Sequence, residues 1–267
     1  NIAVIWHVRD ILSFGMARRL LRRLSIRVPQ KIICISRPVA DMFDQNKVKC
    51  IIVHNGIDIK KTKIESLKKN QNFMKLSQKF SSKIVLACLG QIAHWKGQDR
   101  FVRVIQALKQ AGLPVVGVIV GGVLFPEREA GFYNRLKKTV FRLGLEEDIV
   151  WTGRQENIFP WLEAAQALVH LPRQKEPFGR VLVEAMALKK MVFANQKVAF
   201  HEIFPASWHA WLMDENILAA SKKIIKFFKM KSRTKLVSQG YDQTLQKFDR
   251  KIMARKIENI YQSVLEN

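Results

Sequence analysis

The strongest constraint on the fold is a regular alternation of short apolar segments and longer helix-like ones that begins at Lys83. Five segments are apolar almost throughout, as strands covered on both faces are. They are KIVLACLG, PVVGVIVGG, DIVWTG, ALVHLP and MVFA. Apolar strands that alternate with helices predict a parallel sheet with helices on both faces. We therefore expect residues 83–248 to form one doubly wound α/β domain, with its last two helices at Ile217–Phe228 and Ser232–Phe248.

The first 62 residues carry a shorter version of this pattern. Asn1–Val8 and Lys31–Ser36 are predicted strands, and KCIIVHNGID contains a third that ends in an Asn-Gly turn. Between the first two strands, Ile11–Arg27 has apolar residues at helical spacing among several arginines. This segment is predicted to be a basic amphipathic helix.

Two further segments complete the organisation. Lys60–Ser82 is polar, rich in lysine and weak in apolar periodicity, so we interpret residues 63–82 as a linker. Residues 249–267 are predicted to form a closing helix. Its expected apolar face consists of Ile252, Ile257, Ile260, Tyr261 and Leu265.

Composition limits the classes of protein that remain. The chain has 46 Lys+Arg against 22 Asp+Glu, a formal charge of +24, which favours anionic partners without choosing among them. No helix-turn-helix, zinc, RRM or KH pattern accompanies the charge, so a nucleic-acid partner is not expected. The three cysteines are unevenly spaced among aliphatic residues, which favours reduced thiols over disulfides or a metal cluster. The longest apolar run, Pro114–Pro126, is shorter than the about 20 residues of a spanning helix.

In an open parallel sheet, ligands bind outside the carboxyl ends of the strands. Gly90 follows the first strand of the large domain and allows close approach of a ligand, while Lys96 lies at a helix start, where it offers a charge to a phosphate. A solvated lysine is the alternative explanation of Lys96. Gly153 and Arg154 follow the third strand and place exposed backbone where a flat base would lie, although each is also typical of an ordinary turn.

The segment EPFGRVLVEAMA is the most informative of these strand ends. Glu176 precedes Phe178 and Gly179, and Glu184 lies on the following helix, one turn beyond Arg180. The free amides of a first helical turn form an anion site, and a carboxylate can accept hydrogen bonds from neighbouring sugar hydroxyls. Two carboxylates beside an anion site therefore fit a nucleotide sugar. The alternative is a helix-end charge with an ordinary i,i+4 ion pair.

These motifs together resemble the retaining GT-B glycosyltransferases of family 4, the group 1 glycosyltransferases. The resemblance covers nearly the whole chain in the family's order, including the E-x7-E region at Glu176 and Glu184. The other matching segments are IICISRPVADMF, IIVHNGID, LGQIAHWKGQDRFVRVIQAL, ENIFPWLEAAQALVHLP and YQSVL. The resemblance implies that residues 1–62 are a remnant of the N-terminal acceptor domain, that residues 83–248 bind the nucleotide sugar, and that residues 249–267 return to the first domain.

The resemblance also implies roles for single residues. Lys96 is expected at the donor diphosphate, with the backbone of Phe178, Gly179 and Arg180 at the phosphate or sugar. Glu184 is expected at the ribose. Glu176 is expected to hold sugar hydroxyls and to support positive charge as the glycosidic bond breaks. His7, at the end of a predicted strand, is the candidate near the reaction centre, with a structural histidine as the alternative.

The implied reaction is transfer of a hexosyl group, with retention, from a UDP-, GDP- or ADP-linked sugar to a glycan or lipid-linked acceptor, such as a lipopolysaccharide precursor. No cofactor and no metal ion are expected. The chain departs from the family pattern at Gln91, where an arginine is usual, and Glu202 matches only part of a glycine-rich motif. Roughly a hundred residues of the acceptor domain are expected to be missing.

Two alternatives stay open. A non-catalytic module that binds a nucleotide sugar or a partner on the same fold would carry the same motifs, and turnover distinguishes it from an enzyme. The arginine-rich helix either contacts an anionic membrane surface or is a solvated face of the first domain. We expect a cytoplasmic protein, and the lipid hypothesis places it at the inner face of the cell membrane.

Overall fold

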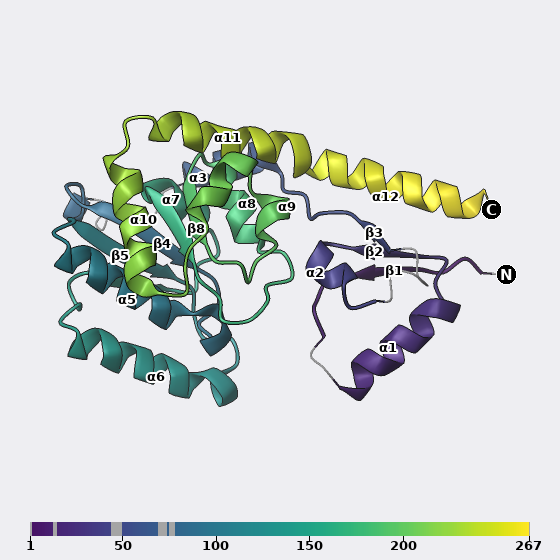
Figure 1. The fold of residues 1–267 in the computed structure, drawn as a ribbon, viewed down its shortest axis with the longest axis horizontal. Helices are drawn as coiled ribbons and strands as arrows, with labels where there is room; N and C mark the ends of the chain where they lie inside the picture. The colour runs from purple at the N-terminus through teal and green to yellow at the C-terminus, as the bar shows by residue number, and fades with distance from the viewer. Residues whose placement is uncertain (1, 13–14, 44–49, 69–73, 75–77, 267) are drawn as a thin grey trace.

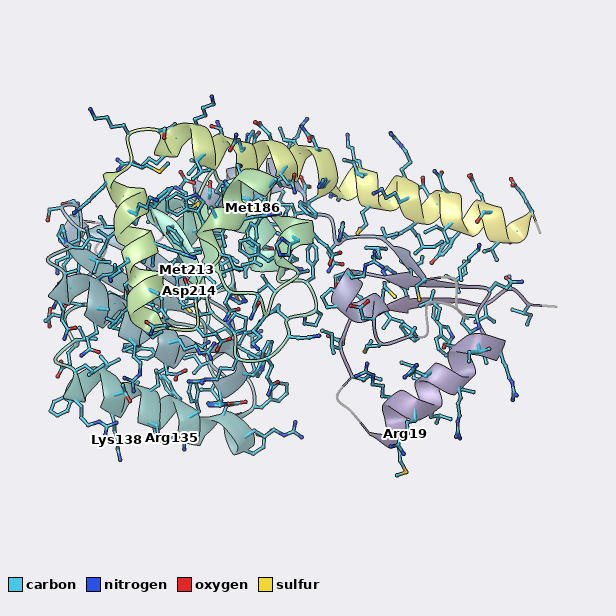
Figure 2. All side chains as sticks on the ribbon, in the orientation of Figure 1. Arg19, Arg135, Lys138, Met186, Met213 and Asp214 are labelled. Carbon is cyan, nitrogen blue, oxygen red and sulfur yellow. The ribbon has the colours of Figure 1, made fainter. Side chains whose placement is uncertain are left out.

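The structure is a computed structural model of the chain, and it describes all residues except 1, 13–14, 44–49, 69–73, 75–77 and 267. The described residues form two parallel sheets, one of five strands and one of three, joined along one side by the long C-terminal helices (Figure 1). Side chains fill the spaces between the helices and each sheet (Figure 2).

The larger sheet has the predicted strands, and its order explains where a ligand can bind. The strand order is β6-β5-β4-β7-β8, and all neighbours are parallel. The strands are β4 (Ile84–Leu89), β5 (Val115–Val120), β6 (Ile149–Gly153), β7 (Ala167–His170) and β8 (Met191–Ala194). Every residue of β5, β7 and β8 is buried, as continuous apolar strands require. The predicted doubly wound α/β fold is thereby confirmed.

The chain reverses its direction of winding between β4 and β7. It runs outward from β4 to β6, then returns to place β7 on the other side of β4. The connecting helices are α5 (Gln98–Gln110), α6 (Pro126–Arg142), α7 (Phe159–Ala164) and α8 (Arg180–Ala187). Because such crossovers are right-handed, the reversal puts α5 and α6 on one face and α7 and α8 on the other. The carboxyl ends of β4 and β7 therefore diverge into a crevice.

Further helices cover the two faces. Helix α10 (Ile217–Lys229) contacts α5, and α11 (Arg233–Lys247) contacts α8. Both match the predicted helices within a residue or two. Shorter turns complete this side of the molecule: α9 (Phe200–Ile203) and 3-10 turns at His94–Lys96 and Ala206–Trp211. Among the described residues, no helix combines the length and apolar character needed to cross a bilayer.

The start of the predicted linker is a helix instead. Helix α3 (Ile59–Ser66) begins after Asp58, whose side chain accepts a hydrogen bond from the Lys61 amide at 3.0 Å. It contacts α7 and α8, and it buries Thr62 and Ser66 along with Ile59. Apolar periodicity missed this helix because two of its buried positions are small and polar. Much of the remaining linker, residues 69–73 and 75–77, lies outside the described residues.

The smaller sheet has the order β1-β2-β3, and its strands are β1 (Ile5–Val8), β2 (Lys31–Cys34) and β3 (Cys50–Ile52). Helix α1 (Met16–Arg27) follows β1 and begins later than the predicted Ile11; α2 (Arg37–Ala40) follows β2. All three cysteines are free, as predicted, and Cys34 and Cys88 are buried.

Helix α12 (Arg250–Leu265) crosses from the larger domain to the smaller sheet (Figure 1). There Ile260 packs with Ile33 and Val53. The predicted apolar face is wrong in part, since Tyr261 is 47% exposed and Leu265 is 80% exposed. The packed residues are Met253, Ile257, Ile260 and Val264, which recur at intervals of three and four.

Candidate functional site

A cavity of about 370 Å³ lies at the crevice where β4 and β7 diverge. The carboxyl ends of four neighbouring strands supply its lining. These residues are Gly90 and Lys96 after β4, Gly121 and Gly122 after β5, Arg154 and Gln155 after β6, and Glu176, Gly179, Arg180 and Glu184 after β7. Its position and lining match the general ligand site of doubly wound sheets.

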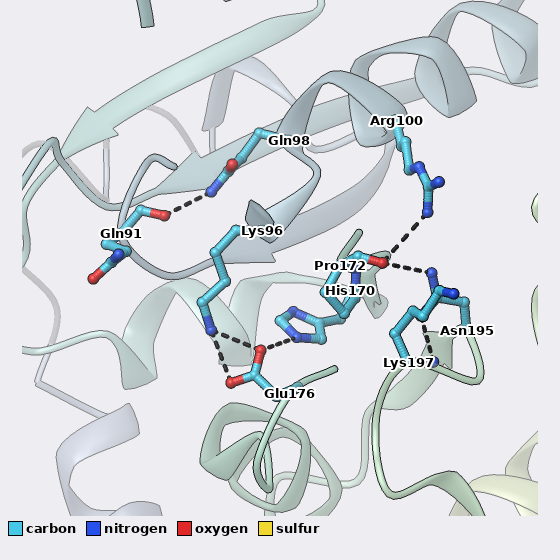
Figure 3. A network of polar contacts seen from close by, with 9 residues as sticks. All are labelled: Gln91, Lys96, Gln98, Arg100, His170, Pro172, Glu176, Asn195 and Lys197. Carbon is cyan, nitrogen blue, oxygen red and sulfur yellow. Dashed lines mark hydrogen bonds and ion pairs between the residues drawn. The ribbon is translucent and has the colours of Figure 1, made fainter. Parts of the chain in front are cut away.

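Lys96 and Glu176 meet in this cavity (Figure 3). The Lys96 ammonium donates to both carboxylate oxygens of Glu176, at 2.9 Å to Oε1 and 2.8 Å to Oε2. Gly97 sets the position of the lysine, because its φ of 73° is left-handed and an added Cβ would lie 2.1 Å from the Leu171 carbonyl oxygen. The turn that carries Lys96 thus lies directly against the end of β7.

His170 completes this polar cluster (Figure 3). It is the last residue of β7 and is 1% exposed, and its Nε2 lies 3.1 Å from Oε2 of Glu176. The apolar pattern of ALVHLP predicts a strand at His170 and no functional role for it. The available signal was a single histidine in a buried strand, six residues before Glu176.

Glu176 is held as a carboxylate by these partners. Burial by itself raises its pKa, but the hydrogen bonds and charges of His170 and Lys96 outweigh burial and lower the pKa to about 2. The backbone is fixed as well, since the Glu176 amide donates to the Lys197 carbonyl at 2.8 Å. Glu176 therefore presents an ionised, oriented acceptor at neutral pH.

Glu184 is buried to a similar degree but has a different environment. It is 5% exposed, and its Oε1 accepts from Nε of Arg180 at 2.9 Å. Burial raises the pKa of Glu184, and the nearby Arg180 guanidinium only partly offsets this effect. Arg180 is itself largely exposed, which weakens its hold on the carboxylate.

The start of helix α8 lies between the two glutamates in the sequence, and Glu184 is on the helix itself. Gly179 precedes its first residue with a φ of 84°, and the structure gives the start of α8 no side-chain cap. The Leu182 amide donates to the Gly179 carbonyl at 2.9 Å, which leaves the amides of Arg180 and Val181 as the first-turn donors that an anion could use.

The structure brings together seven of the ten predicted site residues. Those that line the cavity are Gly90, Lys96, Arg154, Glu176, Gly179, Arg180 and Glu184. Gly153 is next to the lining but not part of it, and the Phe178 side chain is in the core, where it stacks on His54 at 5.9 Å between ring centroids. The lining residues outside these ten are Leu89, Gln91, Val120, Gly121, Gly122, Leu124, Gln155, Ile158 and Val181.

His7 is separate from this cavity. It is an exposed residue of β1 and does not line the cavity. Partial burial, followed by the charge of Arg9, lowers the pKa of His7. The lowered pKa favours a neutral imidazole at neutral pH.

The smaller sheet contacts the loop of the candidate site. Ser36, just after β2, donates its hydroxyl hydrogen to the Pro177 carbonyl. Glu202 of α9 accepts the Arg37 amide at 2.9 and 3.0 Å, and it lies 2.9 Å from Nε2 of His54. The carboxyl side of the smaller sheet therefore faces the segment that contains Glu176.

A second cavity, of about 420 Å³, lies at the opposite ends of β4, β7 and β8. Lys189, Lys190 and Arg233 line it beside Phe227. Lys190 donates to the Glu163 carbonyl at 2.6 Å and Arg233 to the Phe228 carbonyl at 2.7 Å. Its described lining contains no carboxylate, so the cavity at the crevice fits a hydroxyl-bearing ligand better.

Comparison with known proteins agrees with this geometry. The family described as glycosyl transferases group 1 matches residues 42–243. The lipopolysaccharide core biosynthesis mannosyltransferase LpcC of Rhizobium leguminosarum bv. viciae is 30% identical over 119 residues, which are 45% of this chain and 33% of that protein. The mannosylfructose-phosphate synthase of Agrobacterium fabrum is 34% identical over 110 residues, 40% of this chain and 24% of that protein. The matched segments thus span a third or less of these two relatives.

A solved structure matches over a larger part of the chain. HepE of Anabaena, crystallised in complex with UDP-glucose, superposes with a TM-score of 0.83 at 25% sequence identity. The match covers 98% of this chain and 72% of HepE.

Proposed function

Because the chain belongs to the group 1 glycosyl transferases and has a GT-B fold, we propose that it binds a nucleotide sugar at the crevice and transfers its hexosyl group, with retention, to a glycan or lipid-linked acceptor. One observation carries the proposal: two buried carboxylates, Glu176 and Glu184, line one cavity, one before and one after a helix start, with Lys96 bonded to Glu176. The similarity to HepE, solved with UDP-glucose, supports a nucleotide sugar as the donor.

The donor would lie across the start of α8. Lys96 contacts its diphosphate, together with the amides at Phe178, Gly179 and Arg180. Glu184 accepts the ribose hydroxyls. Gly90 allows backbone to approach the donor, and the backbone at Gly153 and Arg154 faces the base. This arrangement accommodates a UDP-, GDP- or ADP-linked sugar, because backbone contacts discriminate weakly among bases.

Glu176 would act at the transferred sugar. The bond between the anomeric carbon and the diphosphate oxygen breaks, and the anomeric carbon forms a bond to the acceptor hydroxyl oxygen, whose proton leaves with the diphosphate. Positive charge develops on the sugar as the first bond breaks, and the ionised carboxylate of Glu176 stabilises it. The diphosphate is neutralised by protein charge without a required metal ion. Gln91 supplies no charge where the family usually has an arginine, so Lys96 contributes more of the positive charge that neutralises the diphosphate.

The acceptor would approach from the side of the smaller sheet. Ser36 and His54 place that sheet against the Pro177–Phe178 loop. His7 is the proposed acceptor-side group, on the first strand of the same sheet. The similarity to LpcC supports a surface-glycan acceptor such as a lipopolysaccharide precursor, made at the cytoplasmic side of the membrane.

We also propose that helix α1 contacts an anionic membrane surface. Its face toward the smaller domain uses Leu21 and Ser25, while Met16, Leu20 and Leu24 are exposed along one stripe. Exposed arginines border this stripe at positions 19, 23 and 27, and Arg19 is labelled in Figure 2. An exposed apolar stripe edged by arginines is typical of helices that lie in a lipid headgroup layer.

Donor binding is tested by calorimetry with UDP-, GDP- and ADP-sugars on the chain and on its Glu184→Ala variant. We expect one donor class to bind and the variant to weaken it by about tenfold, as for loss of hydrogen bonds to a charged group. Exposed Glu146→Ala is the control. Unchanged binding in Glu184→Ala would refute the ribose assignment. Binding without transfer or hydrolysis would favour a non-catalytic module.

Membrane contact is tested by sedimentation with vesicles of phosphatidylcholine, alone or mixed with phosphatidylglycerol. We expect binding only to the mixed vesicles, weakened by Arg19→Glu together with Arg23→Glu. The matched control reverses two lysines of α6, Lys137 and Lys138. Equal binding to both kinds of vesicle would contradict the proposal.

A further inference from the structure

We propose that His170 is a positioning residue for Glu176, whose carboxylate it orients toward the hydroxyls of the donor sugar. The inference deepens the proposed function and rests on it. His170 would not touch the donor. It would act through one hydrogen bond, from its ring nitrogen Nε2 to Oε2 of Glu176.

The geometry makes His170 the rigid partner of Glu176. The histidine ends strand β7 and is 1% exposed. Its ring therefore has little freedom to turn away from Glu176. The 3.1 Å contact is made when the ring carries its proton on Nε2, since an ionised carboxylate only accepts.

Lys96, the other partner, is suited to a different task. A lysine is a point charge on a flexible chain, and the proposed complex shares this ammonium between Glu176 and the donor diphosphate. Any movement of Lys96 toward the phosphates leaves His170 to hold the carboxylate. A buried carboxylate without a partner would tend to take up a proton and would then be a poorer acceptor for sugar hydroxyls.

The packing of β7 gives no other reason for a histidine at this position. Each residue of the strand is buried, and an apolar side chain would satisfy the sheet and the helices that cover it. A buried imidazole needs a polar partner, and within the described structure the hydrogen-bonding partner of this side chain is Glu176. The polarity of His170 is therefore explained by the carboxylate.

Calorimetry on two variants tests the inference. His170→Leu removes the hydrogen bond at similar volume, whereas His170→Gln keeps an N–H donor at comparable reach. The probes are UDP against UDP-glucose and GDP against GDP-mannose, so that each pair isolates the sugar's contribution. We expect His170→Leu to bind the nucleoside diphosphate as the original chain does but to weaken the nucleotide sugar about tenfold. His170→Gln should retain most of the sugar's contribution.

The effect of pH gives a second signature. In His170→Leu the loss of this partner raises the pKa of Glu176, so on acidification the sugar's contribution should be lost at a higher pH in this variant than in the original chain. Unchanged discrimination in His170→Leu, or its loss in both variants, would overturn the inference.

A measurement without donor separates this inference from the proposed function. Carboxyl carbon NMR, with the Glu176 signal assigned by Glu176→Gln, should show a higher titration midpoint in His170→Leu than in the original chain and in His170→Gln. An unchanged midpoint contradicts the role of His170. If the Glu176 midpoint is raised in His170→Leu but no nucleotide sugar binds to the original chain, the result overturns the proposed function instead.

Discussion

At the scale of single residues, Glu176 and Glu184 show how partners decide the charge of a buried carboxyl. Both are almost fully buried, and burial raises the pKa of each. Glu176 has two partners, Lys96 and His170, which reverse the effect and lower its pKa to about 2. Glu184 has one exposed arginine, and its pKa stays raised. The two carboxyl groups of one motif therefore differ in how readily they take up a proton.

The lowered pKa of Glu176 predicts part of the acid sensitivity of the fold. The carboxyl titrates near 4.5 when unfolded and near 2 when folded, so its contribution to the free energy of unfolding is complete above about pH 4.5 and disappears as pH falls toward 2. Glu176→Gln should therefore make that free energy fall less steeply between pH 5 and 3 in urea titrations. Glu146→Gln, at an exposed position, should leave the slope unchanged. Equal slopes in all three proteins would contradict the partnership.

Gly97 carries a second prediction at this scale. Gly97→Ala forces a side chain into a left-handed backbone and against the Leu171 carbonyl, so we expect a loss of about 2 kcal/mol or more in the free energy of unfolding. Gly112→Ala is the matched control, because its φ of 78° is similar but nothing lies within 4 Å of the added carbon. Urea unfolding compares the two, and equal losses would show that contact with β7 is unimportant.

At the scale of elements, α12 links the larger domain to the smaller sheet through a narrow stripe. Its cap at Asp249 accepts the Lys251 amide at 2.8 Å, and Arg250 donates to the Ile57 carbonyl at 3.0 Å. Beyond this start, Ile260 supplies the buried contact to β2 and β3. The helix is held at one end by hydrogen bonds and farther along by apolar packing.

Two alanine substitutions in α12 distinguish the apolar face that packs in the structure from the predicted one. Ile260→Ala should lower the free energy of unfolding by about 2 kcal/mol, because it leaves a cavity beside Ile33 and Val53. Leu265→Ala should change it by less than about 0.5 kcal/mol, since that side chain is 80% exposed. Chemical denaturation measures both. A larger loss of free energy of unfolding in Leu265→Ala than in Ile260→Ala would support the predicted face instead.

At the scale of the whole molecule, Glu202 connects the two sheets. Its carboxylate accepts the Arg37 amide and meets His54, which in turn stacks on Phe178 beside the donor loop. This contact joins residues more than a hundred positions apart in the chain. Together with the hydrogen bond from Ser36 to the Pro177 carbonyl, it holds the smaller sheet against the donor loop.

Removal of this connection should loosen the smaller sheet before the larger one. Glu202→Ala leaves the Arg37 amide and His54 without this acceptor, so hydrogen exchange should become faster at residues 50–57, with the β4–β8 core unaffected. The control is Glu258→Ala, an exposed position on α12. Exchange that is unchanged, or that increases equally in both domains, would contradict a local connection.

Much of the fold and the site could be predicted because their causes are local in the sequence. Continuous apolar strands indicated the parallel sheet, and polar residues just after those strands indicated the crevice. The role of His170 could not be predicted, because nothing near it in the sequence shows that its ring contacts Glu176. Helix α3 could not be predicted from apolar periodicity, because the polar residues Thr62 and Ser66 occupy two of its buried positions. The domain roles and the catalytic use of His7 stay predictions.

The amino-acid sequence alone predicts the doubly wound sheet, the strand ends that line the cavity and the eight-residue spacing that places Glu176 in a loop and Glu184 on a helix. These depend on the period of apolar residues and on local backbone chemistry. The folded structure is needed to see that Lys96 and His170 hold Glu176, that Glu202 joins the two sheets and that Ile260 rather than Leu265 meets the smaller sheet. Such choices depend on which distant side chains share a space of a few ångströms, and no local pattern encodes that distance.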